Sequence, residues 1–469
     1  MAGSIQKPKN TSITQYPEVH PALLGVFLIF VIFKYLQGGY RVPWLGEIRF
    51  ELIVGALLTV FAIPAYLSIK QRQPSSVIPW AIGLLLMMVL SVPFSIDPAF
   101  SWNVFVDRGF KFALVGVFIA AFVTSPRALR WFLLIFLLAF LKMAEEGVVG
   151  SITGSMIWEN QGVPRLHGST PNYFHPNSFS GTQLATLPFA VELFIISQWR
   201  LRYLLAVQIL MAATVIVFCG SRTAYVAGVI WIVMRSLQSR KKLKGVTVLL
   251  VAGVIAINFI PEEYIGRFES AITQTDKEGA SIDTRKEILR DAWELTLRHP
   301  LGIGAGAFPI ARMEAFGRIQ DTHNLYLEIT TNLGFLGLLV FAGLIIAMLR
   351  SLSRSRDSLD QDIKLLSNHI SHLPAAAEIH NSIAAHLVDL RLLSASCRAL
   401  GAFIVIRLLL GLFGHDLYEI YWWFAAGLTV ALQQLGNTAT IKTRTLYPAS
   451  QTSSQISPGH TNRPIPLAY

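Results

Sequence analysis

Two arginines and one histidine in a mostly apolar sequence have the chemistry needed to act on an anionic substrate. Arg222 lies in a Gly-Ser-Arg-Thr-Ala turn between two apolar runs, where small neighbours leave room for a bulky anion. Arg285 begins a charged helical segment further along the chain. A guanidinium donates paired hydrogen bonds to phosphate oxygens, so two inward-facing arginines on one face suit a diphosphate. The alternative is that each arginine only anchors its segment at the membrane surface.

The position of Arg285 follows from a helical wheel at 100° per residue over 285–298. One side of this helix collects the charged residues Glu287, Arg290, Asp291, Glu294 and Arg298. The other side collects Ile288, Leu289, Ala292 and Trp293. Arg285 falls in the middle of the apolar side, so we expect it to turn inward unless it reaches back to water.

His323 lies in Asp321-Thr-His-Asn-Leu-Tyr-Leu-Glu328, at the mouth of an apolar span for which Asp321 or Thr322 is the expected N-cap. Imidazole has an ordinary pKa near 6.5, which makes His323 the candidate general base, although a structural role is the alternative. Upstream, the glycines of 299–308 run G-x-G-x-G without a preceding strand, which predicts a close-packed turn and no dinucleotide site.

The weaker candidates lie in Gly414-His-Asp-Leu-Tyr-Glu-Ile-Tyr-Trp-Trp423. Asp416 and Glu419 could bind sugar hydroxyls and Tyr421 could stack on a sugar ring, although an interfacial aromatic belt also explains these aromatics. Arg407 lies within a span, where a charge is a functional hypothesis by default. Metal-binding and nucleotide-binding motifs are lacking, so we expect no metal and no cofactor.

The elements that must position these side chains are membrane helices. Apolar residues make up 53% of the 469 residues and charged residues 14%, which excludes a secreted domain, a cytosolic enzyme and a disordered regulator. The net charge of +11 fits basic loops on the cytoplasmic face of a membrane, so no nucleic-acid partner is expected. The fold class is therefore an all-α polytopic membrane protein with about 12 transmembrane helices.

The expected spans are 22–40, 51–69, 77–95, 110–125, 130–148, 178–197, 202–220, 223–238, 245–260, 324–349, 396–413 and 417–434. The predicted divisions are a cytoplasmic tail (1–21), nine transmembrane helices (22–260), a periplasmic segment with an amphipathic helix (261–322), a tenth helix (323–349), a cytoplasmic interfacial segment (350–395), two last helices (396–434) and a disordered cytoplasmic tail (435–469). Basic residues concentrate in the loops that this arrangement leaves inside, which places both termini in the cytoplasm.

Several motifs together resemble those of the O-antigen ligase and polymerase superfamily. They are Gly-Ser-Arg-Thr-Ala, the outer-loop arginine before His-Pro-Leu-Gly-Ile-Gly, His-Asn-Leu-Tyr-Leu at a helix start, and His175-Pro-Asn-Ser-Phe-Ser180. The resemblance covers about 170–345. It implies a GT-C-like glycosyltransferase of the bacterial inner membrane that transfers glycan from an undecaprenyl-diphosphate carrier at the periplasmic face, without metal.

Carried over to this sequence, the resemblance implies that Arg222 and Arg285 bind the diphosphate and that His323 activates an acceptor hydroxyl. Possible contacts to acceptor or sugar are His175, Asn177, Asn324, Asp416, Glu419 and Tyr421. The implied partners are the lipid-linked donor, membrane lipids, and an acceptor that is lipid A–core, another glycan or a protein. This leaves a ligase, a polymerase and a protein oligosaccharyltransferase open, in the assembly of lipopolysaccharide or another surface polysaccharide.

Two other functional classes compete with the transferase. One is a transporter of a small anion such as bicarbonate, for which a dozen helices is a usual number. Transporter sites lie near the bilayer midplane on broken helices with inverted repeats, whereas the candidate residues here are expected at the surface. The other is a scaffold for polysaccharide assembly, which would leave the inward arginines without a purpose.

Overall fold

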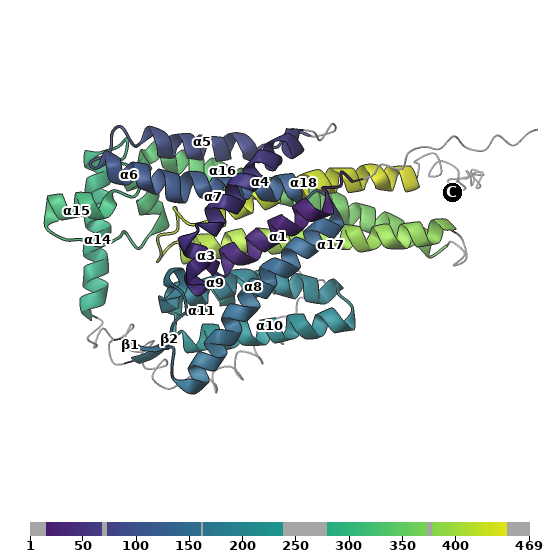
Figure 1. Ribbon diagram of the computed structural model, residues 1–469, viewed down its shortest axis with the longest axis horizontal. Helices are drawn as coiled ribbons and strands as arrows, with labels where there is room; N and C mark the ends of the chain where they lie inside the picture. Colours follow the sequence, from purple (N-terminus) through teal and green to yellow (C-terminus); the bar gives the residue numbers. More distant parts are fainter. Residues whose placement is uncertain (1–15, 68–72, 161–162, 238–278, 373–377, 448–469) are drawn as a thin grey trace, which may run out of the picture.

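The computed structural model describes residues 16–67, 73–160, 163–237, 279–372 and 378–447. Over these residues the chain is a helical bundle with one small β-hairpin (Figure 1). The N-terminal half contains α1 (Pro21–Tyr35), α2 (Gly38–Arg41), α3 (Pro43–Glu47), α4 (Phe50–Leu67), α5 (Val77–Leu90), α6 (Pro98–Val104), the π-helix η1 (Phe105–Phe110), α7 (Lys111–Phe122), α8 (Pro126–Thr153), the strands β1 (Ile157–Asn160) and β2 (Val163–Leu166), and the 3-10 helix η2 (Pro171–Tyr173).

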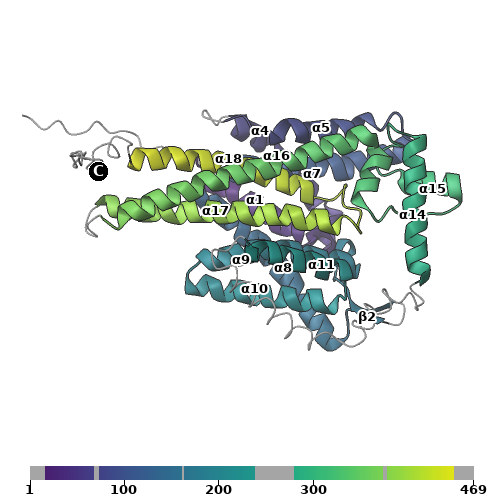
Figure 2. The same ribbon diagram turned by 180° about the vertical axis from the view of Figure 1, so that it is seen from behind.

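The rest of the described chain is helical. It contains α9 (Pro176–Ile196), α10 (Trp199–Phe218), α11 (Arg222–Leu237), α14 (Gly279–Arg298), α15 (Phe308–Phe316), α16 (Leu325–Ile370), α17 (Glu378–Leu410) and α18 (Tyr421–Leu446). Seen from either side, the long helices run along a common direction and α14 crosses their end (Figure 2).

The all-helical prediction is confirmed, and the described helices are consistent with a polytopic membrane protein. Five helices are long and apolar enough to cross a membrane, namely α4, α9, α10, α16 and α17, and two shorter apolar helices are α1 and α5. Each predicted span within the described residues falls on a helix, and the span expected at 245–260 lies outside them. The total of about 12 and the GT-C-like arrangement stay predictions.

The centre of the bundle is built by α9, α16, α17 and α18, with α7 and α8 packed around them. Apolar side chains fill this centre, and the ring of Phe136 on α8 stacks on Phe424 of α18 at 4.8 Å between centroids. Helices α7 and α18 touch through backbone, because a Cβ on Gly427 would collide with the carbonyl oxygen of Gly116. Burial of these apolar surfaces fixes the helix ends on which the polar candidates lie.

The glycine-rich segment before α16 forms the close-packed turn that its sequence predicts. Gly302, Gly304 and Gly306 all have positive φ, and a Cβ on Gly302 would lie 2.5 Å from the carbonyl oxygen of Asn332. The turn pairs with α16 through Ile303 N–H, which donates to Thr331 O at 2.9 Å. Here α16 is kinked at Gly334, which has φ 73° and ψ −178°. The turn therefore holds the first part of α16 in place.

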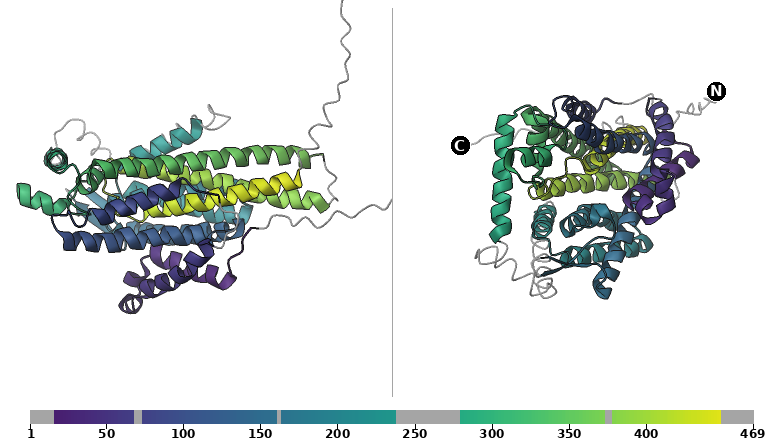
Figure 3. Two further views of the ribbon diagram at one scale, coloured as in Figure 1. Left: turned by 90° about the horizontal axis from the view of Figure 1, so that it is seen from above. Right: turned by 60° about the vertical axis from the view of Figure 1, so that its left-hand side comes forward.

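The segment 350–395, predicted to lie at the membrane interface, is helical where the structure describes it, apart from the turn after α16. Helix α16 continues to Ile370 and α17 begins at Glu378, so the two helices run side by side past the ends of their neighbours (Figures 1 and 3). Leu359, Leu366 and Ile383 are fully buried there. These residues belong to an apolar seam in which α18 takes part, because a Cβ on Gly436 would lie 3.9 Å from Leu359. Contact of this segment with the membrane surface stays a prediction.

Helix α14 lies across the end of the bundle, as the right-hand view of Figure 3 shows. Its buried face contains Ile288, Ala292 and Leu295, which pack on the glycine-rich turn and α15. Asp291, expected on the exposed side, is also buried, because its Oδ2 accepts a 2.9 Å hydrogen bond from Nε of the fully buried Arg312. Conversely, Trp293 is 49% exposed. The wheel is therefore right for Ile288 and Ala292 and wrong for Asp291, Trp293 and Arg285, since Arg285, expected to turn inward, is also exposed.

Candidate functional site

A cavity of about 280 Å³ lies where α9 and α11 begin and α17 ends. Six of the predicted site residues line it: His175, Asn177, His323, Asp416, Glu419 and Tyr421. Arg407 lines it as well, together with several residues that the sequence did not single out, among them Asn172, Ser221, Thr223 and His415. The structure thus brings together side chains that are up to 249 residues apart in the sequence, from Asn172 before α9 to Tyr421 at the start of α18.

His323 is held at the mouth of α16 in an unusual backbone conformation. Its φ is 48°, in the left-handed region that few residues other than glycine adopt and that recurs at functional sites. The N-cap is Asn324, not Asp321 or Thr322 as predicted, because its Oδ1 accepts from the backbone N–H of Tyr326 and of Leu327, each at 3.0 Å. The cap thereby fixes the backbone that follows His323.

The other half of the Asn324 side chain ties α16 to the end of α17. Its Nδ2 donates to Leu412 O at 3.1 Å, and the N–H of Leu325 donates to Gly411 O at 2.7 Å. The amide of Asn324 therefore bonds to backbone on both sides, and Asn324 is absent from the cavity lining. Asn324, which was expected to contact sugar, therefore positions the start of α16 against the end of α17.

Burial is the main electrostatic influence on His323. It lowers the pKa of the imidazole to about 4, and the neighbouring His415, Arg285 and Arg312 lower it further, while the carboxylate of Asp321 raises it. The two nearby arginines alone would lower this pKa, but burial is the leading cause. At neutral pH the ring is uncharged and has a nitrogen that can accept a proton.

His415 is a cavity residue that sequence reasoning missed. Its ring centroid lies 5.3 Å from that of His323 in an edge-on arrangement, and its Nε2 lies 3.7 Å from Oδ2 of Asp321. The only signal in the sequence was its place beside Gly414 in the last outer turn. Asp321, His415 and His323 thus form a row of titratable groups that ends at the cavity.

On the opposite wall, His175 caps the start of α9. Its Nδ1 accepts from the N–H of Asn177 at 3.2 Å, and burial together with the charge of Arg165 lowers its pKa to about 4. Arg165 on β2 is only 6% exposed and donates to Asn177 Oδ1 at 2.6 Å and to Cys219 O at 2.9 Å. This buried guanidinium joins the hairpin, α9 and the turn before α11, and sequence reasoning gave it no part in the site.

Arg407 and Asp416 form a buried ion pair in the cavity wall. Arg407 is 3% exposed, and its guanidinium lies 3.5 Å from the ring centroid of Tyr421. The backbone carbonyl of Asp416 accepts from Nε1 of Trp422 at 2.9 Å, so both the side chain and the backbone of Asp416 are held in place. The tyrosine hydroxyl lies 3.0 Å from Oγ1 of Thr182 on α9. Helices α9, α17 and α18 therefore meet around the Arg407–Asp416 ion pair.

Glu419 lines this cavity and two smaller neighbours of about 170 and 240 Å³. Its Oε1 accepts a 2.8 Å bond from Nη1 of Arg108 on η1. Burial raises the pKa of the Glu419 carboxyl, against the lowering effect of Arg108. His415 lines both the main cavity and the 240 Å³ cavity, so the loop 411–420 is a wall shared between them.

The two predicted diphosphate ligands lie beside the cavity and are not in its lining. Arg222 is the first residue of α11, between Ser221 and Thr223, which do line it. Arg285 lies on the exposed side of α14, and its charge contributes to lowering the pKa of both His175 and His323. Both arginines are thus at the end of the bundle where the cavity opens, on different elements.

Comparison with known proteins bears on the centre of the sequence. Within the described residues no cluster of His, Cys, Asp or Glu has an arrangement that could hold a metal ion. A search of curated proteins finds no match to this chain. A family model described as O-antigen ligase matches residues 206–342, the range that contains Arg222, Arg285 and His323. Over that region the chain is similar to the O-antigen ligase family, and the match confirms the predicted resemblance.

Proposed function

We propose that the protein transfers a glycan from a lipid-linked diphosphate carrier to an acceptor hydroxyl, with His323 as the general base. The observation that carries the proposal is that His323 borders a polar cavity while burial keeps its imidazole unprotonated. The family match supports a transferase over an anion transporter. The donor is undecaprenyl-diphosphate-linked glycan, and the reaction takes place at the periplasmic face of the inner membrane.

In the reaction, the acceptor oxygen attacks the anomeric carbon of the donor sugar from the face opposite the diphosphate. A new carbon–oxygen bond forms as the bond to the diphosphate breaks, so the configuration inverts. The hydroxyl proton passes to His323, and the electron pair of the broken bond leaves with the diphosphate. The departing negative charge needs a positive environment, which Arg222 and Arg285 supply beside the cavity.

The proposal also assigns roles to the acidic residues that line the cavity. Asp416 is paired with Arg407 and Glu419 with Arg108, so both carboxylates are oriented to accept hydrogen bonds from sugar hydroxyls. Tyr421 lies under Arg407 and presents the aromatic surface of this wall. A metal ion has no part in this mechanism, because arginines neutralise the leaving group.

The test is transfer from a lipid-diphosphate donor by the purified protein carrying His323→Ala or His323→Gln. We expect both variants to lose transfer while they retain donor binding, because neither replacement accepts a proton and the arginines remain. His372→Gln is the matched control, since this exposed histidine lies just beyond the far end of α16, away from the cavity. A glutamine variant with most of the wild-type rate would make His323 structural and would move the base to Asp416, Glu419 or His175.

Metal independence is tested in the same assay. Transfer should continue in EDTA, since the proposed mechanism relies on guanidinium groups. Loss of transfer in EDTA that a divalent cation restores would contradict this mechanism, and Asp416 and Glu419 would be the first carboxylates to test as ligands.

A further inference from the structure

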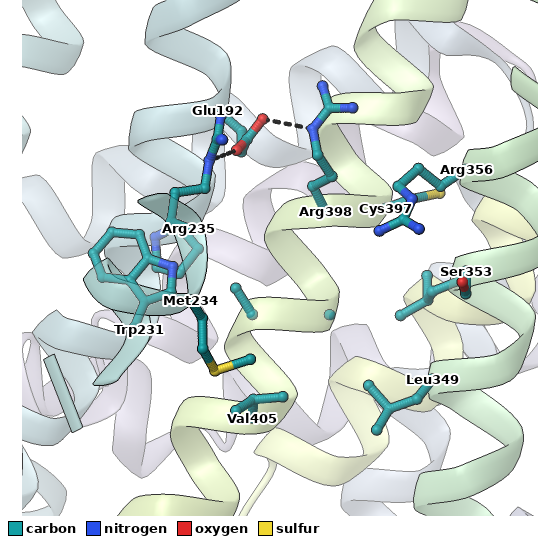
Figure 4. A pocket seen from close by; sticks show the side chains of 14 residues that line it. Glu192, Trp231, Met234, Arg235, Leu349, Ser353, Arg356, Cys397, Arg398 and Val405 are labelled. Atoms are coloured by element: carbon teal, nitrogen blue, oxygen red, sulfur yellow. Dashed lines mark hydrogen bonds and ion pairs between the residues drawn. The ribbon is translucent and has the colours of Figure 1, made fainter. Parts of the chain in front are cut away.

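A second groove lies away from the cavity just described, between α11 and α16, with α17 as its floor (Figure 4). Its volume is about 180 Å³. The proposed transfer reaction makes no use of it. Its lining combines three arginines with a set of apolar side chains, and the two kinds of residue occupy different parts of the groove (Figure 4).

The charged part of the groove is organised by one carboxylate. Glu192 on α9 has a side chain only 5% exposed, and it accepts from Nε of Arg235 at 2.7 Å and from Nε of Arg398 at 2.9 Å. A guanidinium has five N–H donors, so the bond to Glu192 leaves the terminal nitrogens of Arg235 for other acceptors, whereas Nη1 of Arg398 also donates to Ser394 Oγ at 2.8 Å. Arg356 on α16 faces the groove from the other side, and it bonds to the exposed Asp357 at 2.8 Å.

The apolar part of the groove begins next to these arginines. Met234, Leu349 and Val405 lie below the charged groups in Figure 4 and come from three different helices. The floor is shallow at Gly401, where an added Cβ would meet no atom within 4 Å. The groove therefore has one end that suits an anion and another that suits a hydrocarbon chain.

The position of the groove along the helices places the charged part near the far membrane boundary. Arg235 follows the start of α11 at Arg222 by enough residues to lie about 20 Å along the helix axis. Glu192 lies about 24 Å along α9 from its first residue, Pro176. Both helices begin at the cavity, and the hydrocarbon core of a bilayer is about 30 Å thick. The arginines thus lie at a depth where lipid headgroups of the opposite leaflet are found.

We propose that this groove binds an anionic membrane phospholipid. The phosphate accepts hydrogen bonds from the terminal nitrogens of Arg235 and Arg356, and one acyl chain lies along Met234 and Val405. The lining itself holds three arginines and one carboxylate, while Asp357 and Asp360, which are not in the lining, also contact Arg356 and Arg398. The groove therefore presents guanidinium groups, with Glu192 as the one carboxylate of its lining, to a phosphodiester. Glu192 keeps its two arginines in place and is not displaced by the lipid.

The test measures phosphatidylglycerol binding to the purified full-length chain by native mass spectrometry, without glycan donor. Arg235→Gln combined with Arg356→Gln should weaken binding about tenfold or more, because two charge-assisted hydrogen bonds are lost. Arg398 is left intact so that Glu192 retains a partner. The matched control is Arg200→Gln, an exposed arginine at the same end of the bundle, which should bind as the wild type does.

A second variant tests the groove without changing any charge. Gly401→Leu should block the floor, and leucine is a better helix former than glycine, so the helix is preserved. We expect it to weaken phosphatidylglycerol binding as the arginine variant does. Equal binding of phosphatidylglycerol by the wild type and both variants would overturn the proposal.

Two further arms identify the ligand class. Phosphatidylcholine should bind more weakly, because its choline cancels the charge of its phosphate. Soluble glycerol phosphate should not displace phosphatidylglycerol, since it has no acyl chain. Displacement by glycerol phosphate would overturn the lipid site in favour of a site for free phosphate. Equal affinity for phosphatidylglycerol and phosphatidylcholine would contradict the proposal that the arginines select an anionic headgroup.

Discussion

His323 should remain an effective proton acceptor in mildly acidic solution, because its pKa is lowered to about 4. Burial disfavours the charged imidazolium, and the only carboxylate that opposes this effect among the main influences is Asp321. The rate should therefore be nearly constant from neutral pH to about pH 5.5 and should fall only as the pH passes through about 4.

The magnitude follows from the fraction of unprotonated base. At pH 5.5 a group with a pKa of about 4 is about 97% unprotonated, whereas at the ordinary value of 6.5 it would be about 9% unprotonated. The two alternatives differ about tenfold in rate at this pH, which is much larger than the error of an initial-rate measurement. The sign is fixed because protonation removes the acceptor nitrogen.

The assay is kcat/KM for transfer as a function of pH, with donor and acceptor whose own groups do not titrate between pH 4 and 8. Asp321→Asn provides the matched variant, because loss of the carboxylate that raises the pKa should move the acid limb to still lower pH. An acid limb near pH 6.5 in the wild type would refute the argument that burial sets the protonation of His323. A limb that Asp321→Asn leaves unchanged would show that another group titrates.

Three further predictions concern other parts of the chain. Arg222→Ala and Arg285→Ala should each lower kcat/KM severely at normal membrane expression, with only partial rescue by lysine, which lacks the planar fork; an unchanged rate would remove that arginine from the mechanism. Asp291→Asn should destabilise the protein by about 3 kcal/mol in thermal or denaturant unfolding, because it leaves a buried guanidinium without its anion, whereas Glu287→Gln, at a largely exposed carboxylate, should have little effect. A cysteine placed at 285 should react with an impermeant thiol reagent from the periplasm and one placed at 364 should not, and the reverse pattern would overturn the orientation.

The sequence predicts the helices well because their cause is local. Apolar runs of about 20 residues have to be helical in a membrane, since only a helix satisfies the backbone within a single segment. The helix mouth at His323 and the glycine-rich turn before α16 are predictable for the same reason, because capping and positive φ depend on neighbouring residues. Local rules do not decide between Thr322 and Asn324 as the cap, since both have a suitable side chain.

The remainder of the site depends on contacts between segments far apart in the sequence. His415 lines the cavity because loop 411–420 packs against the start of α16, where the N–H of Leu417 donates to Oε2 of Glu328 at 3.0 Å. Arg165 becomes part of the wall only because the hairpin packs on α9. No periodicity in the sequence encodes such pairings, and for this reason Asp291 was also assigned to the wrong side of α14.

The kink at Gly334 divides α16 into two rods of very different length. The first, from Leu325 to the kink, is about 14 Å long, and the second, to Ile370, is about 53 Å. The i to i−4 ladder is interrupted between them, and the short rod is bonded to the glycine-rich turn and to the end of α17. Bending of the long rod, which packs beside α17 and α18, is therefore absorbed at the kink. The backbone geometry at His323 is thus mechanically separated from forces that act on the far end of the same helix.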